Sequence, residues 1–69
     1  MRTLHEAIIE IVDNVGNLTP AQIAWILNQS NLYVKHDNSE IQASQIYARI
    51  SQYPNLLYVR DGKVFKRFR

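Results

Sequence analysis

Apolar residues recur at helical spacing over the first fifteen positions of the chain, with acidic residues on the opposite side. The apolar stripe consists of Leu4, Ile8, Ile11, Val12 and Val15. Thr3 and Glu6 stand at its start with the three-residue spacing of a capping box. Gly16 suits the left-handed conformation in which many helices end. The pattern therefore predicts a helix over residues 3–15.

A second helix is predicted to begin after Thr19. Thr19 is the expected N-cap, Pro20 the first helical residue and Gln22 the reciprocal capping partner. Leu18 and Ile23 occupy the two positions of a hydrophobic staple across this start. The core face expected for the helix consists of Ile23, Ile26, Leu27 and, at its edge, Ser30. Two short amphipathic helices thus follow each other directly.

The segment Ala43–Tyr53 predicts a third amphipathic helix, with a start between residues 40 and 44. Ser39 and Gln42 have the spacing of a capping box, and Pro54 disfavours a helical conformation at the residue before it. The expected core face consists of Ala43, Ile46, Ile50 and Tyr53. The outer face is polar, with one cation and no carboxylate, which is typical of a helix that lies against bases and phosphates.

Two β-rich runs, LLYVR and KVFKRFR, flank the dipeptide Asp61-Gly62 and predict a β-hairpin. The cross-strand pairs expected from a two-residue turn are Arg60–Lys63, Val59–Val64 and Tyr58–Phe65. The valine pair then lies on one face and the aromatic pair on the other, so the pattern leaves open which face packs on the core. Residues 17–18 are candidates for a short third strand against this hairpin.

The chain has 69 residues, enough for a single small domain that spans residues 1–69. It has no cysteine, which excludes disulfides and Cys-based zinc sites. No apolar run approaches the roughly 20 residues of a membrane span, and acidic residues interrupt any signal-peptide pattern near the N-terminus. We expect a cytoplasmic domain with no membrane partner.

Charge is divided unevenly along the chain. Residues 1–40 contain two cations and five acids, for a net charge of −3, whereas residues 41–69 contain six cations and one acid, for a net charge of +5. The positive half is also the half with the polar-faced helix and the hairpin. This asymmetry favours a polyanionic partner, and the alternative is a basic tail that has no partner.

The order of three helices and a basic hairpin is that of a winged helix-turn-helix domain, an α+β fold. The segments LHEAIIEIV, LTPAQIAWIL, NLYVKHDNS and ASQIYARISQYPNLL, with the DGK turn, resemble the HARE-HTH group of winged-helix domains over nearly the whole chain. The resemblance implies a DNA-binding or DNA-associated module, of the kind fused to restriction, modification, transcription and chromatin proteins and also found as small bacterial proteins. The chain departs from the group in Trp25, where a polar residue is expected, and in its aromatic, very basic wing.

The leading hypothesis is binding to double-stranded DNA, with the third helix in a groove and the hairpin, or wing, on the backbone. Ser44, Gln45 and Gln52 are expected to face base edges. Because serine and glutamine discriminate only weakly between bases, we expect modest sequence specificity. Arg60, beside the turn, is expected to reach toward a minor groove. The residues expected to neutralise phosphates are Arg49, Lys63, Lys66, Arg67 and Arg69.

The alternative hypothesis is a winged helix that binds protein, because a fold does not determine a function. Trp25 lies off the core stripe of the second helix. Either a loop or the wing covers it, or it belongs to a contact surface, most simply that of a homodimer, since aromatic residues are enriched at interface anchors. The basic residues would then meet an acidic partner.

An enzyme is the least favoured hypothesis. His5 and His36 have no spacing that makes a metal site or a nucleophile–base pair. The chain's two glycines, Gly16 and Gly62, stand at turns and form no phosphate-binding loop. We therefore expect no catalytic residue, no metal, no cofactor and no small-molecule substrate.

Overall fold

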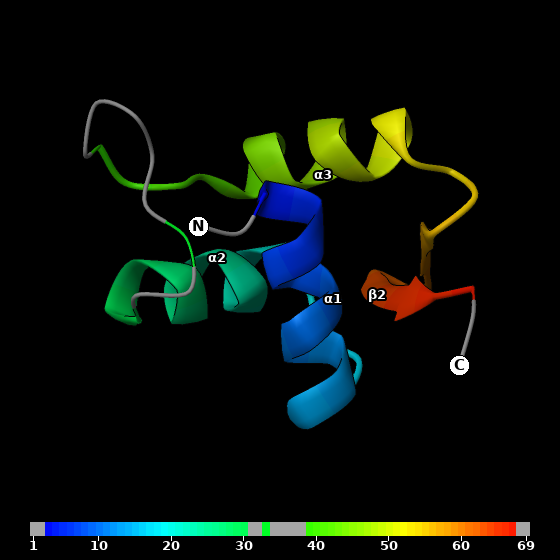
Figure 1. Cartoon of the computed structure of the whole chain (residues 1–69), viewed down its shortest axis with the longest axis horizontal. Coiled ribbons are helices and arrows are strands. Elements are labelled where there is room, and N and C mark those ends of the chain that lie inside the picture. The colour runs from blue at the N-terminus through cyan, green and yellow to red at the C-terminus, as the bar shows by residue number, and fades with distance from the viewer. Residues whose placement is uncertain (1–2, 31–32, 34–38, 68–69) are drawn as a thin grey trace.

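Three helices and a two-stranded antiparallel hairpin follow one another along the chain (Figure 1). The computed structural model describes residues 3–30, 33 and 39–67, so that Arg69 and His36 lie outside the described residues. The elements are α1 (Leu4–Asn14), α2 (Pro20–Gln29), α3 (Ala43–Gln52), β1 (Leu57–Arg60) and β2 (Lys63–Lys66). This small α+β arrangement is compatible with a winged helix-turn-helix. Among the helices of the described segments, none combines the length and the apolar character that crossing a bilayer requires.

Reciprocal capping boxes begin the first two helices, as predicted. The Thr3 hydroxyl accepts a hydrogen bond from the Glu6 N–H at 3.3 Å, and the Glu6 carboxylate accepts one from the Thr3 N–H at 2.9 Å. Thr19 and Gln22 make the same pair of bonds at 3.2 and 2.9 Å. Beyond α1, Gly16 has a φ of +122°, which a residue without Cβ adopts readily.

One hydrophobic core joins the three helices and the hairpin. Ile8 of α1, Ile23 of α2, Ile46 of α3 and Val64 of β2 are fully buried, and Leu57 of β1 is almost so. Each element therefore buries at least one large aliphatic side chain in a common interior. In a domain this small, such shared burial supplies most of the stabilising free energy.

The buried face of α2 is wider than the predicted stripe. Ala24 is buried, although the pattern does not assign it to the core, and Ile26 lies half-buried at the margin. The reason is that α2 packs on both α1 and α3, so two adjoining sides of the helix are covered.

The hairpin has the predicted register, with Arg60 opposite Lys63 and a turn at Asp61 and Gly62. Both turn residues have positive φ, 53° and 77°, as a type I′ turn requires. The face that packs on the core is the one that carries Leu57 and Val64, and the stacked aromatic pair lies on the other face.

The pairing anticipated for residues 17–18 is present as one backbone hydrogen bond. The Val64 N–H donates to the carbonyl of Leu18 at 2.8 Å. Neither residue 17 nor residue 18 forms a strand. The bond nevertheless ties the start of α2 to the hairpin.

Candidate nucleic-acid interface

The third helix, α3, separates an apolar face from a polar one. Ile46 and Ile50 are buried against the rest of the molecule, whereas Ser44, Ala48 and Gln52 are exposed on the opposite side. The ten residues of the helix include no acid. The exposed face can therefore approach a polyanion without repulsion from its own side chains.

Gln45, which was expected at a base edge, caps the start of α3. Its Oε1 accepts a hydrogen bond at 2.7 Å from the backbone N–H of Gln42, the extended residue that precedes the helix. The predicted capping box between Ser39 and Gln42 is therefore wrong, because Gln42 is the N-cap and not the third helical residue. Of the three side chains expected at base edges, Ser44 and Gln52 are exposed and Gln45 is half-buried.

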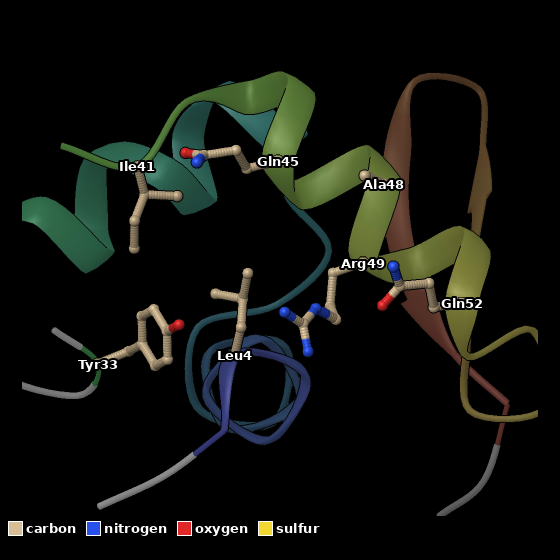
Figure 2. Close-up of a pocket in the computed structure, with 7 residues that line it drawn as sticks. All are labelled: Leu4, Tyr33, Ile41, Gln45, Ala48, Arg49 and Gln52. Carbon is tan, nitrogen blue, oxygen red and sulfur yellow. The ribbon is translucent and has the colours of Figure 1, made fainter. Parts of the chain in front are cut away.

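A pocket of about 240 Å³ opens between α3 and the first turn of α1 (Figure 2). It is lined by Leu4, Tyr33, Ile41, Gln45, Ala48, Arg49 and Gln52. Arg49 is half-buried and extends from α3 toward Leu4, with the amide of Gln52 beside it. The one cation of α3 thus lies on the flank of the exposed face that adjoins α1.

The outward face of the hairpin combines cations with aromatic rings. Tyr58 and Phe65 stack across the strands, with ring centroids 5.4 Å apart and 15° between the ring planes. Strand alternation places Arg60 and Lys63 on the same face at the turn, where both side chains are exposed. We call the surface formed by Arg60, Lys63 and Arg67 around this aromatic pair the cationic face.

Arg67 extends the cationic face beyond β2. Its backbone N–H donates to the carbonyl of Leu56 at 2.9 Å, which continues the strand pairing by one residue. Its guanidinium carbon lies 4.5 Å from the centre of the Tyr58 ring, and its Nε donates to the carbonyl of Pro54 at 2.6 Å. Arg67 therefore links the hairpin to the turn after α3. The guanidinium charge is stabilised by the face of the Tyr58 ring through a cation–π interaction.

Lys66 has a different setting from the other cations of the hairpin. It pairs across the strands with Leu57, on the side that faces the core, and its Nζ forms an ion pair with Oδ1 of Asp13 on α1. This residue was expected on a phosphate, but here it joins the hairpin to α1. At the turn itself, Asp61 places one carboxylate among the exposed cations.

Asn28 fixes the segment before α3, a role that the sequence pattern does not indicate. Its Oδ1 accepts from the Ile41 N–H at 2.8 Å, and its Nδ2 donates to the Ile41 carbonyl at 3.0 Å. One side chain on α2 thus satisfies both backbone groups of a buried residue two positions before the helix. An asparagine near the end of a helix is usually interpreted as a cap or a surface residue, so only the tertiary contact reveals this role.

Replacing Asn28 by alanine is expected to lower the free energy of unfolding by about 1–3 kcal/mol. The substitution leaves the N–H and the carbonyl of Ile41 without their partner in a partly buried position. Urea denaturation of the Asn28→Ala variant measures the effect. Gln29→Ala, at the exposed neighbouring residue, is the control and should change stability by no more than about 0.5 kcal/mol. Equal effects of the two substitutions would contradict the role of Asn28.

The end of α3 is held by an aromatic contact with α1. The imidazole of His5 stacks on the ring of Tyr53, with centroids 3.9 Å apart and 23° between the planes. The Thr3 hydroxyl lies 3.1 Å from Nδ1 of the same imidazole. The helix is therefore positioned at its start from α2 and at its end from α1.

Trp25 projects from α2 into solvent, with 64% of its surface exposed. The interpretation in which a loop or the hairpin covers it is therefore wrong. Tyr47, on the flank of α3, is also 48% exposed. The two aromatic residues belong to different elements, Trp25 to α2 and Tyr47 to α3.

No family model, no curated protein and no solved structure matches this chain. The resemblance to the HARE-HTH group accordingly rests on segments of the sequence alone.

Proposed function

We propose that the chain is a winged-helix module that binds double-stranded DNA, with α3 in a groove and the hairpin as the wing. The observation that carries the proposal is the cationic face, where Arg60, Lys63 and Arg67 lie on one side of the hairpin. Charge gathered on one face suits a regular array of phosphates better than charge spread around the molecule. The acid-free outer face of α3 provides the second surface that such a module needs.

The two surfaces have different tasks in this proposal. Arg49 and the cationic face neutralise phosphates, and Arg60, the member of that face beside the turn, does so from a minor groove toward which it reaches. Ser44 and Gln52 meet base edges, where a hydroxyl and an amide discriminate less strongly than an arginine on guanine. The module therefore combines electrostatic attraction with modest sequence specificity. Since Lys66 is paired with Asp13, we assign it no phosphate.

A salt titration of duplex binding tests the proposal. With about four phosphates neutralised, the logarithm of the association constant should fall against the logarithm of salt concentration with a slope near −3.5. Affinity should therefore drop roughly 100-fold between about 50 and 200 mM salt. Fluorescence anisotropy with two duplexes of unrelated sequence measures the slope, which should be similar for both.

Chemical shifts recorded during the same titration locate the surface. Amide resonances of α3 and of the hairpin should move, whereas those around Trp25 should not. Binding that is independent of salt, or shifts confined to α2, would contradict the proposal.

A further inference from the structure

An apolar hollow lies beside Trp25, away from α3 and the hairpin. It has a volume of about 270 Å³ and is lined by Val15, Leu18, Gln22, Trp25 and Ile26. Val15 is 59% exposed, so the hollow includes two of the three most exposed large hydrophobic residues in the described part of the chain. Apolar surface gathered in this way on a small domain marks a contact site more often than scattered residues do.

The hollow is separate from the proposed DNA-binding surface. Its lining comes from the end of α1, the following turn and α2, and includes no residue of α3 or of the hairpin. Figure 1 shows the C-terminal end of α1, in light blue, on the opposite side of the molecule from α3. An occupant of the hollow would therefore leave α3 accessible.

The chemistry of the hollow defines its occupant. None of its five lining residues carries a formal charge, so the hollow offers no ion pair to a phosphate or to a charged peptide. The occupant has to supply a neutral, apolar side chain. An apolar cavity of about 150 Å³ holds a benzene ring, so 270 Å³ has room for an indole.

This surface itself presents such a side chain. Trp25 also borders a second depression, formed by α2 and the segment that leads into α3, so its indole stands as a ridge between two hollows. A projecting side chain next to a hollow of suitable size is self-complementary under a two-fold rotation. Because the residues that line the 270 Å³ hollow are uncharged, two copies can approach through it without like-charge repulsion between those residues.

We propose that a second copy of the chain occupies the hollow, in a two-fold contact in which Trp25 of each protomer inserts beside Val15 and Leu18 of its partner. A standard interface buries about 800 Å² on each partner, which would be about one sixth of the 4645 Å² surface of this chain. The hollow is lined by five residues, far fewer than the roughly 20–30 residues that each partner contributes to a standard interface. The dimer should therefore be transient, with a dissociation constant in the micromolar to millimolar range.

Sedimentation equilibrium and tryptophan fluorescence of the full chain test the proposal without DNA, so failure of DNA binding would leave the result unaffected. From about 10 µM to about 1 mM, the mass should rise toward that of a dimer. Trp25 is the only tryptophan, so its emission should shift to shorter wavelength over the same range as water leaves the indole. A chain that stays monomeric, or an emission maximum that does not move, would overturn the proposal.

Matched variants identify the surface. Trp25→Gln should weaken association about 30-fold or more, as expected for an aromatic anchor, and Val15→Lys should do the same by placing a charge in the hollow. Both sites are exposed, so the fold should survive. Tyr47→Gln removes the exposed aromatic residue of α3 and should associate like the parent chain. Association that persists in Trp25→Gln, or is lost in Tyr47→Gln, would place the contact elsewhere.

Discussion

Replacing Arg60 and Lys63 together by glutamine is expected to weaken binding to duplex DNA on the order of 100-fold at about 50 mM salt. Both cations are exposed at the turn of the hairpin, and each should neutralise one phosphate. Removing two phosphate contacts should also reduce the steepness of the salt dependence by about two. Anisotropy titrations at several salt concentrations give the affinity and the slope from one experiment.

Lys66→Gln is the matched control for this double variant. It also removes a cation from the hairpin, but one that faces the core and pairs with Asp13. Its affinity for DNA should stay within about threefold of the parent, and its salt slope should not change. Arg67 is left in place in both variants because it contacts Tyr58 and the Pro54 carbonyl. If net charge alone governed binding, Lys66→Gln would weaken it roughly tenfold, half the loss of the double variant on a logarithmic scale, and that result would contradict the role of the cationic face.

Replacing Ile46 by alanine is expected to reduce the free energy of unfolding by about 3 kcal/mol. Ile46 is fully buried on the inner face of α3, and the smaller side chain leaves a cavity that a close-packed interior cannot fill. A domain of this size has a stability of roughly 5 kcal/mol, so most of it would be lost. The melting temperature should fall by roughly 10–25 °C, as measured by circular dichroism.

Ser44→Ala, on the exposed side of the same helix, is the control for Ile46→Ala. It should alter stability by no more than about 0.5 kcal/mol, because the Ser44 side chain is exposed to solvent. If the two substitutions destabilised the chain equally, α3 would not be anchored through its apolar face. If neither did, the helix would contribute little to the core.

The contacts around α3 have a functional consequence. Asn28 holds the segment before the helix, Ile46 and Ile50 hold its inner face, and the His5–Tyr53 stack holds its end. In the proposed complex with DNA, a helix fixed in this way would lose little further conformational freedom on entering a groove. Binding then costs less free energy than it would for a helix that had to be ordered first.

Local features of the fold could be predicted from the sequence because their partners are close together along the chain. The Thr3–Glu6 and Thr19–Gln22 capping boxes each join residues three apart. The register of the hairpin follows from the two residues of its turn, since Asp61 and Gly62 adopt the positive φ that an Asp-Gly turn favours. The inner and outer faces of α3 follow from helical periodicity alone.

Other features were decided by the tertiary structure, because they depend on residues far apart in the sequence. Lys66 forms an ion pair with Asp13, 53 positions away in the sequence, and is therefore not one of the cations on the outward face of the hairpin. Both faces of the hairpin are apolar, so only the fit of Leu57 and Val64 against the helices determines which face is buried. Whether Trp25 is covered likewise depended on the tertiary structure, in which 64% of its surface is exposed. By itself, the sequence determined which elements form and which side of each helix is polar. The packing of the elements against one another decided which face of the hairpin is buried and which charged and aromatic side chains remain on the surface.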